Sequence, residues 1–416
     1  MMLEELLQAL DSRQKRVFEV HSALTAFKAV GPDNGGPGEM AKAKWLARLL
    51  QNAGIHDIEY VNAKDDRVAG GERPNLIVRI PGKTPRMLWI LGHLDVVPPG
   101  EMDLWTSDPW QVTYDETDTD LLRGRGVEDN QQAIVAGMVL ALELAELGIT
   151  PDFGLGLIFV ADEETGNKYG VSYLLAQKPN LISQDDLVLV PDFGSADGTL
   201  VEVAEKGVLW VKITLTGKQC HASTPDEGVN ALIAASDMIL RISDVERAFP
   251  IKNELFEPQR TTLTPTRHDA NVPNINTMPG QDVFFVDCRV LPEYSLEQVF
   301  EALVALGVTI KEKYGVEVEF ERINIEPSSM PTRVDSEVVQ KLMCAVKSIY
   351  GVDCRAHGVG ASTVACWIRK KGISAAVWSR VIPNYHMPNE ATRISNNIGD
   401  AKVFASMLFA CMPCAL

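Results

Sequence analysis

Residues 89–97 read Trp-Ile-Leu-Gly-His-Leu-Asp-Val-Val, and this stretch decides how the chain is interpreted. The apolar run from Met87 to Leu91 predicts a buried central strand of an α/β sheet. Side chains two positions apart on a strand share a face, so His93 and Asp95 can meet at the carboxyl end of this strand. Sites in α/β sheets lie at that edge. The pair fits a metal-binding imidazole backed by a carboxylate, although such a pair alone is more often structural.

Length and composition narrow the class of protein. The chain has 416 residues, too many for one ordinary core, so we expect two domains. A net charge of -17 argues against nucleic acid and anionic membranes as partners. The first residues lack the basic and apolar regions of a secretory signal, and seven cysteines suggest reduced thiols, so we expect a cytoplasmic protein. The single C-x-x-C motif, Cys411 to Cys414, has no second pair and does not predict a structural zinc site.

The order of predicted elements indicates an α/β domain interrupted by an insertion. Expected helices cover 3–26, 39–52 and 131–147, and expected strands cover 58–61, 75–80, 155–160 and 186–190. From Lys206 to Arg322 the pattern becomes strand, helix, strand, helix, strand, which is typical of an α+β layer. The α/β pattern then resumes with elements at 336–350, 375–378 and 397–412. We therefore predict a discontinuous domain, 1–205 and 323–416, and an inserted domain, 206–322.

Acidic and histidine side chains follow several of these predicted strands or begin a helix: His93, Asp129, Glu163, Glu164, Asp192 and His386. Carboxylates that converge on one sheet edge would repel each other, and a cation is the simplest remedy. Mixed imidazole and carboxylate ligands suit Zn²⁺ and, less specifically, Co²⁺ or Mn²⁺. Five of these six side chains acting as ligands would exceed the needs of one open catalytic zinc. Five ligands fit two metals, about 3.5–4 Å apart, that share a carboxylate.

In order and spacing, the motifs resemble those of a family of co-catalytic di-zinc hydrolases. The family includes aminoacylase, carboxypeptidase G, acetylornithine deacetylase and succinyl-diaminopimelate desuccinylase. The matching motifs are H-x-D at 93–95, G-R-G-x-x-D at 124–129, D-E-E-x-G at 162–166, Asp192, and H-x-P-N-E at 386–390. The resemblance implies two zinc ions held by His93, Asp129, Glu164, Asp192 and His386. It also implies that Asp129 bridges the metals, that Asp95 supports His93 and that Glu163 is the general base.

The resemblance extends to the insertion and to the fold. It implies a zinc-peptidase-like α/β catalytic domain with an inserted ferredoxin-like dimerisation domain. Residues 217–225 resemble the motif G-x-x-x-H-x-S-x-P, which implies that His221 stabilises the oxyanion in the partner subunit of a homodimer. Asn276, Arg289, Gly360 and Ser362 resemble contacts to the substrate. Without the resemblance, His221 would be interpreted as a loop histidine and Arg289 as part of a surface ion pair.

Two stretches depart from the family pattern. Asn130-Gln131-Gln132 stands where the family commonly has Lys-Gly, and the loop 358–363 lacks the acid of the family's G-G-T-S-D/A sequence. Both stretches are expected near the substrate, so the preferred acyl group stays open. Four further histidines match no family role and are expected to be structural or solvent-facing: His21, His56, His268 and His357.

The pattern as a whole predicts a metal-dependent hydrolase that cleaves an amide bond of an N-acyl amino acid or a small peptide. An aminopeptidase or dipeptidase is an alternative, and it needs an acid to bind a free α-amine. Glu128, Asp162 and Glu390 are the candidates for that acid. A non-catalytic metal-binding protein on the same fold is a further alternative.

Overall fold

The computed structural model describes residues 2–410, so the motif from Cys411 to Cys414 lies outside the described residues. The chain divides into two compact units. The first comprises Met1–Val203, Thr332–Ala356 and Thr363–Leu416, and the second comprises Ala204–Pro331 and His357–Ser362. The predicted division after Arg322 falls inside strand β16 (Glu317–Glu326), whose pairing with β11 (Gly207–Thr216) continues to Glu326.

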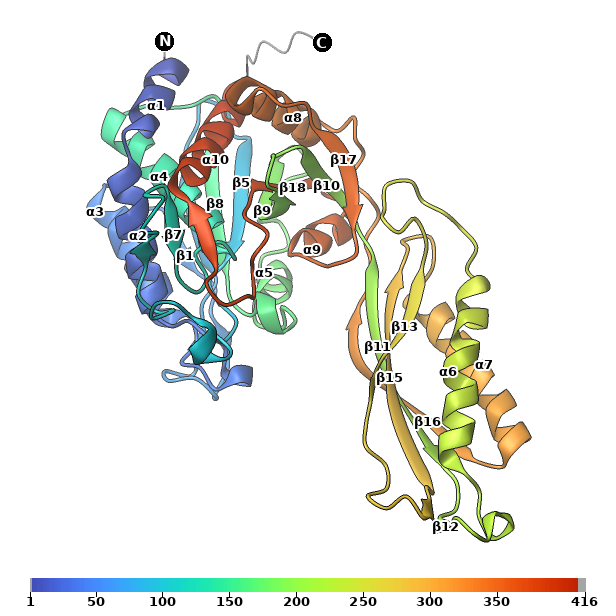
Figure 1. Cartoon of the computed structure of the whole chain (residues 1–416). Coiled ribbons are helices and arrows are strands. Elements are labelled where there is room, and N and C mark those ends of the chain that lie inside the picture. The colour runs from blue at the N-terminus through green and yellow to red at the C-terminus, as the bar shows by residue number, and fades with distance from the viewer. Residues whose placement is uncertain (1, 411–416) are drawn as a thin grey trace. The chain divides into compact units, whose positions relative to one another are not determined.

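An eight-stranded mixed sheet forms the first unit, in the order β1-β4-β8-β5-β9-β18-β10-β17. Its strands are β1 (Ile58–Tyr60), β4 (Leu76–Ile80), β5 (Met87–His93), β8 (Gly154–Val160), β9 (Leu187–Ser195), β10 (Leu200–Glu205), β17 (Arg355–Val359) and β18 (Ala375–Arg380). Strand β5 pairs in parallel with both β8 and β9, as Figure 1 shows. The three strands therefore deliver their carboxyl ends to one edge of the sheet.

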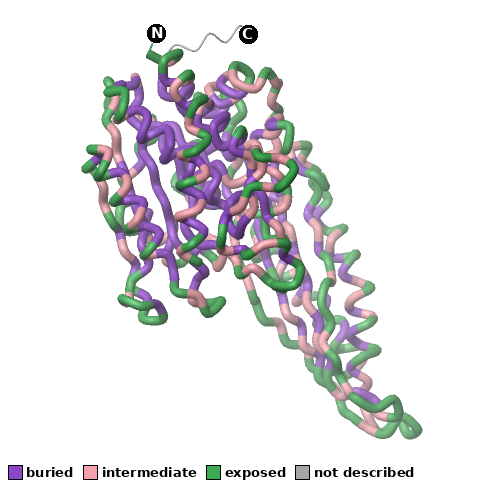
Figure 2. The backbone as a smooth tube through the Cα atoms, turned by 60° about the vertical axis from the view of Figure 1, so that its left-hand side comes forward, coloured by how far each residue is buried: buried purple, intermediate pink, exposed green. Residues whose placement is uncertain are grey.

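Helices accompany this sheet: α1 (Met2–Asp11), α2 (Gln14–Ala26), α3 (Met40–Asn52), α4 (Gln131–Leu147), α5 (Val171–Gln177), α8 (Glu337–Tyr350), α9 (Ala365–Lys370) and α10 (Ile394–Met407). The single helix predicted over 3–26 is wrong, because the chain breaks between α1 and α2. Helix α4 is buried over most of its length, as is strand β8 (Figure 2). A helix that is apolar on all sides belongs in a core, which explains why its bounds were predictable.

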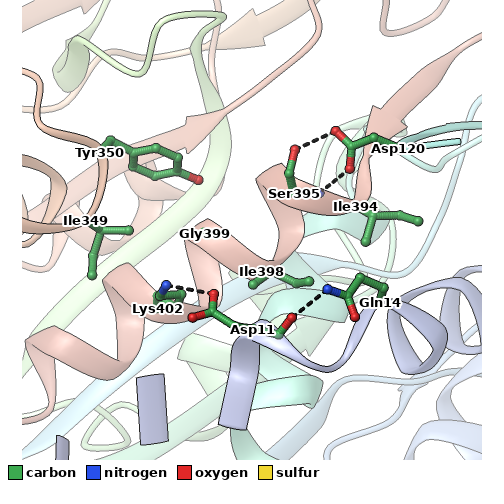
Figure 3. Close-up of a pocket in the computed structure, with 10 residues that line it drawn as sticks. All are labelled: Asp11, Gln14, Asp120, Ile349, Tyr350, Ile394, Ser395, Ile398, Gly399 and Lys402. Atoms are coloured by element: carbon green, nitrogen blue, oxygen red, sulfur yellow. Dashed lines mark hydrogen bonds and ion pairs between the residues drawn. The ribbon is translucent and has the colours of Figure 1, made fainter. Parts of the chain in front are cut away.

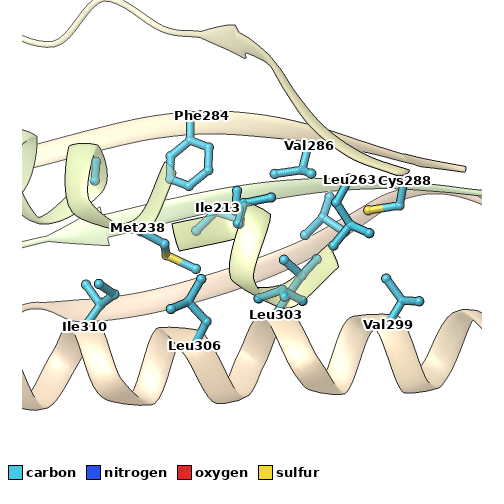
Figure 4. Close-up of a cluster of buried hydrophobic side chains, with 14 of the residues drawn as sticks. Ile213, Met238, Leu263, Phe284, Val286, Cys288, Val299, Leu303, Leu306 and Ile310 are labelled. Carbon is cyan, nitrogen blue, oxygen red and sulfur yellow. The ribbon is translucent and has the colours of Figure 1, made fainter. Parts of the chain in front are cut away.

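The second unit is a β-α-β-β-α-β layer in which β11, α6 (Ala231–Arg247) and β13 (Thr262–His268) precede β15 (Gln281–Val290), α7 (Leu296–Tyr314) and β16. The strand order β13-β15-β11-β16, with antiparallel neighbours, is ferredoxin-like. Strand β13 was not predicted, because Pro265 and the exposed polar residues around it disguise an edge strand. Val299, Leu303, Leu306 and Ile310 of α7 point toward the sheet, where they meet Ile213 and Phe284 (Figure 4).

The predicted fold class, an α/β unit with an inserted α+β unit, is confirmed. Short strands complete the described chain: β2 (Ala63–Lys64), β3 (Glu72–Arg73), β6 (Thr113–Tyr114), β7 (Leu121–Arg123), β12 (Cys220–His221), β14 (Thr277–Met278) and β19 (Ala391–Arg393). Within residues 2–410, no helix has the length and apolar character needed to cross a bilayer. Cys220, Cys288 and Cys354 are free thiols, whereas Cys344 is disulfide-bonded, so the prediction of reduced thiols is wrong for Cys344.

Candidate metal centre

The ends of three neighbouring strands bring the predicted ligands together. His93 is the last residue of β5, and Asp192 lies near the end of β9. Glu163 and Glu164 begin a short 3₁₀ turn (Glu163–Thr165) just after β8. The parallel pairing of these strands therefore places side chains from distant parts of the sequence at one sheet edge.

Asp129 lies between two histidines, and each of its carboxylate oxygens faces a different one. Its Oδ1 is 2.9 Å from His93 Nε2, and its Oδ2 is 3.0 Å from His386 Nε2. Asp192 Oδ1 lies 3.5 Å from His93 Nε2, whereas Glu164 Oε2 lies 3.1 Å from His386 Nε2. The five predicted ligands thus form two sets that share the carboxylate of Asp129.

The donor atoms fit divalent cations. Ligand atoms of His93, Glu163 and Asp192 lie within 4.8 Å of one another, as do those of His93, Asp129 and Glu164. Glu164 Oε1 is buried and has no hydrogen-bond partner among the described residues. Imidazole and carboxylate donors that converge at such distances, with a buried oxygen unused, match the chemistry of a zinc-type site.

Burial and mutual repulsion perturb the acids of this site. Burial and the neighbouring Asp129 raise the pKa of Glu164 from 4.5 to about 7. Burial, Asp192 and Glu164 raise the pKa of Glu163 well above its usual range, although His93 opposes this shift. Hydrogen bonds to Asp129 and Glu164 raise the pKa of His386 to about 10. Cations placed among these carboxylates would offset the repulsion that adds to burial in raising the pKa values of Glu163 and Glu164.

Asp95 organises the site mainly through the backbone. Its Oδ1 and Oδ2 accept hydrogen bonds from the N–H groups of Glu163 and Glu164, at 3.1 and 3.0 Å. His93 Nδ1 lies 3.0 Å from the main-chain oxygen of Asp95 and 3.5 Å from its Oδ1. The aspartate therefore holds the turn that carries Glu163 as well as the ring of His93, a double contact that the sequence pattern did not reveal.

Asn130 contributes to the frame of the site. Its side-chain oxygen accepts a hydrogen bond from His93 N at 3.2 Å, and its Nδ2 donates to Asp192 Oδ1 at 2.6 Å. A Cβ atom at Gly92 would lie 2.6 Å from Asn130 Oδ1, so this close approach requires glycine. The only sequence signal for Asn130 was its place in the stretch that departs from the family pattern.

The other two residues of that stretch do not face the candidate site. Gln131 and Gln132 are buried, and Gln131 Oε1 accepts a hydrogen bond from Thr25 Oγ1 at 3.0 Å. Gln132 Nε2 donates to Ser379 Oγ and Asp400 Oδ2, at 2.8 and 2.9 Å. Both side chains are therefore bonded within the core, and the expectation that this stretch lies near the substrate stays a prediction.

Glu390 holds the segment that leads to Asp129. Its carboxylate accepts hydrogen bonds from the N–H groups of Gly126, Glu128 and Asp129, at 2.9, 2.9 and 3.1 Å. Arg125 Nη1 pairs with the same carboxylate at 2.6 Å, and both side chains are almost completely buried. The carboxylate of Glu390 is consequently occupied by these main-chain N–H groups and by Arg125.

The carboxylate of Asp162 is likewise occupied by an arginine and a main-chain N–H group. Its Oδ1 lies 2.8 Å from Arg73 Nη1, and Arg73 also pairs with the buried Glu39. Its Oδ2 accepts a hydrogen bond from Tyr169 N at 2.9 Å. This buried network fixes the residue directly before Glu163, although nothing in the local sequence marked Arg73.

Glu128 differs from these two acids. Its side chain is 6% exposed, and its Oε2 is buried without a hydrogen-bond partner among the described residues. Burial, Asp129 and Glu390 raise the pKa of Glu128 well above its usual range, and Asp192 and His386 are among the other charged groups that act on it. Glu128 therefore lies within electrostatic reach of the ligand set, and its side chain forms no ion pair with another described residue.

The predicted residues of the insertion lie in the second unit, where they form two local groups. His221 pairs with Thr277 between β12 and β14, and the main-chain oxygen of Asn276 accepts a hydrogen bond from Ala222 N at 2.9 Å. Arg289 Nε donates to Asp287 Oδ1 at 2.7 Å and Arg289 Nη1 donates to the oxygen of Gly360 at 2.8 Å. Ser362 ends the segment of the second unit that contains Gly360.

A separate hollow in the first unit was not predicted and lacks the features of a metal site. It has a volume of about 300 Å³ and is lined by residues of α1, α8 and α10, among others (Figure 3). Its charged groups are already paired, since Lys402 Nζ lies 2.8 Å from Asp11 Oδ1 and Ser395 Oγ donates to Asp120 Oδ2 at 2.6 Å. We assign it no role.

Comparison with known proteins identifies the family. The model of peptidase family M20/M25/M40 matches residues 89–410, which include all the predicted metal ligands. The chain belongs to this family. As a member of the M20 family, it is a metallohydrolase that acts on peptide or amide bonds. The resemblance predicted from the motifs is thereby confirmed.

Relatives of this M20 chain have several names. An uncharacterized metallohydrolase of Methanococcus maripaludis is 36% identical and covers 94% of this chain and 98% of its own. A succinyl-diaminopimelate desuccinylase of Nitratiruptor is 25% identical and covers 73% of this chain and 79% of its own. The di-peptidase Dug1p of Saccharomyces cerevisiae has a similar fold, with a TM-score of 0.74, 16% identity and 98% of each chain covered.

Proposed function

We propose that this chain hydrolyses an amide bond of an N-acyl amino acid or a small peptide and uses two divalent cations, preferably zinc. The observation that supports a pair of metals most directly is the position of Asp129, whose two oxygens face His93 and His386 separately. Asp192 would complete one ligand set and Glu164 the other. Co²⁺ or Mn²⁺ would also suit these ligands.

Bound cations would supply an acidified water and would polarise the carbonyl of the substrate. Glu163 acts as the general base: it takes a proton from the attacking water and returns that proton to the leaving nitrogen. The turn that carries Glu163 is held in place because Asp95 accepts hydrogen bonds from the main-chain N–H groups of Glu163 and Glu164. The buried surroundings of Glu163 favour a high pKa, as a residue that carries a proton during turnover requires.

The second unit is proposed to complete the site in a homodimer. His221 of one subunit would donate to the oxyanion that develops in the partner's site. Asn276, Gly360 and Ser362 would line the substrate's carboxylate end. Arg289 offers a guanidinium fork suited to the substrate's carboxylate. That carboxylate would compete with Asp287 for the guanidinium.

The first experiment combines elemental analysis of the purified chain with hydrolysis of N-acetyl amino acids, N-succinyl amino acids and dipeptides. About two zinc ions per chain, with cleavage in any group, is the result expected. Absence of bound metal after reconstitution would overturn the proposal. Two bound metals without cleavage of any of these substrates would favour a non-catalytic metal-binding protein instead.

Glu163→Gln tests the assigned base. General acid–base catalysis contributes about 10²–10⁴-fold, so kcat should fall by that factor while metal content stays unchanged. Glu19→Gln, on the exposed face of α2, is the matched control and should leave both quantities unchanged. Loss of metal in the Glu163 variant would show that this carboxylate is a ligand rather than the base.

A further inference from the structure

Three acids near the candidate metal centre could in principle bind a cationic group of a substrate, and two of them are already occupied. Glu390 is paired with Arg125 and accepts three main-chain N–H groups. Asp162 is paired with Arg73 and accepts Tyr169 N. Neither carboxylate has capacity for a substrate without breaking a buried ion pair, which is costly.

Glu128 remains, and its backbone is held firmly in position. Its N–H donates to Glu390 Oε1 at 2.9 Å, and the next residue is Asp129, whose carboxylate faces both histidines. The side chain is more than nine-tenths buried, yet its Oε2 has no hydrogen-bond partner in the described chain. A buried carboxyl oxygen without a hydrogen-bond partner costs free energy unless a donor comes to it.

We propose that Glu128 pairs with an ammonium group of the substrate and so selects amides that carry such a group. The proposal rests on the amide-hydrolase function proposed above and specifies its substrate class. An ammonium group has three donors, which suits a carboxylate with a free buried oxygen.

The ammonium group could be the α-amine of a peptide or the side-chain amine of an acylated diamino acid. Two pairs of compounds separate these sources. Nα-acetyl-lysine and Nα-acetyl-norleucine differ in the side-chain ammonium, which only the lysine compound has. Alanyl-alanine and N-acetyl-alanyl-alanine differ in the free α-amine. Each pair also contains a substrate without the ammonium, which reports on amide hydrolysis independently of Glu128.

The experiment measures kcat and KM for the four compounds in the zinc-loaded wild type and in Glu128→Gln, with Glu19→Gln as the matched control. Binding of the same compounds to the zinc-loaded Glu163→Gln chain is measured by calorimetry, so that affinity is known without turnover. We expect the wild type to prefer one ammonium compound over its uncharged partner. Glu128→Gln should weaken binding of that compound about 10- to 100-fold and leave the uncharged partner unchanged.

The outcomes distinguish this proposal from the proposed function. Cleavage of uncharged compounds with no preference for ammonium would overturn the role of Glu128 and leave amide hydrolysis standing. Binding preference for ammonium without any cleavage would support Glu128 and contradict the amide-hydrolase proposal. Loss of metal in Glu128→Gln would assign Glu128 to the ligand set and overturn the ammonium site. If that variant does not fold, equal binding within each compound pair by the Glu163→Gln chain would overturn the proposal.

Discussion

Two kinds of buried acid occur in the first unit, and they differ in what balances their charge. Glu390 and Asp162 are 0% and 1% exposed, and each is paired with a buried arginine, Arg125 or Arg73. The side chains of Asp129, Asp192 and Glu164 in the metal centre are 18%, 7% and 8% exposed, and their ion-pair partners in the described chain are His93 and His386. A permanent cation marks the first kind, and a side chain that can lose its proton marks the second.

The difference separates structure from chemistry. Arginine stays protonated under all conditions in which the protein is folded, so its acids are balanced permanently. Histidine can deprotonate and become a metal ligand, and the acids beside it are then balanced by the metal instead. The type of partner therefore distinguishes a supporting acid from a candidate metal-binding one.

Removal of a permanent cation should produce the largest loss of stability. Arg125→Met leaves Glu390 buried without its partner, and breaking a buried pair costs about 3–5 kcal/mol. Urea unfolding of the metal-loaded chain measures this loss. The control is Arg86→Met at the half-exposed pair with Glu337, where less than about 1 kcal/mol is expected. Equal losses of unfolding free energy in both variants would mean that the buried ion pair contributes no more to stability than the half-exposed one.

Removal of the metals should make stability depend on pH. In the metal-free chain the pKa of Glu164 is raised from 4.5 to about 7, so the folded state binds a proton that the unfolded state releases. Stability should then fall by about 3 kcal/mol as pH rises from 4.5 through 7. The raised pKa of His386, about 10, extends the loss to higher pH. Urea unfolding after chelation measures this slope.

Restored zinc is the control for that measurement. Cations balance the carboxylates, so the fall between pH 5 and 7 should disappear when zinc is added back. A metal-free chain that is as stable at pH 7 as at pH 5 would contradict the view that the charge of the site acids is balanced by bound metal.

His21 provides the smallest effect and sharpens the contrast between histidines. It is buried, its Nε2 lies 2.9 Å from Asn397 Oδ1, and burial lowers its pKa from 6.5 to about 4. The unfolded chain therefore binds a proton first as pH falls below 6.5, and at pH 5 this should cost about 2 kcal/mol of stability. His21→Gln should lack that acid-side loss in urea unfolding, and an unchanged pH profile would contradict the assignment.

Much of the fold could be predicted because many helices and strands coincide with local hydrophobic patterns in the sequence. Helix α4 and the strands β5 and β8 are continuous apolar runs, and they appear within a few residues of their expected bounds. The broken N-terminal helix and strand β13 were missed, because a short turn and a proline-containing edge strand leave no strong periodic signal. Local propensity is a weak guide wherever tertiary contacts determine the outcome.

The sequence by itself determined which residues could be ligands, since motif order and strand ends single out His93, Asp129, Glu164, Asp192 and His386. Only the tertiary structure decided the use of the remaining polar residues. Arg125 meets Glu390 across 265 positions, whereas Glu128 Oε2 is buried without a hydrogen-bond partner among the described residues. The reason is physical: a motif specifies which groups are present, but the charge balance of a buried group depends on side chains that folding brings to it from elsewhere.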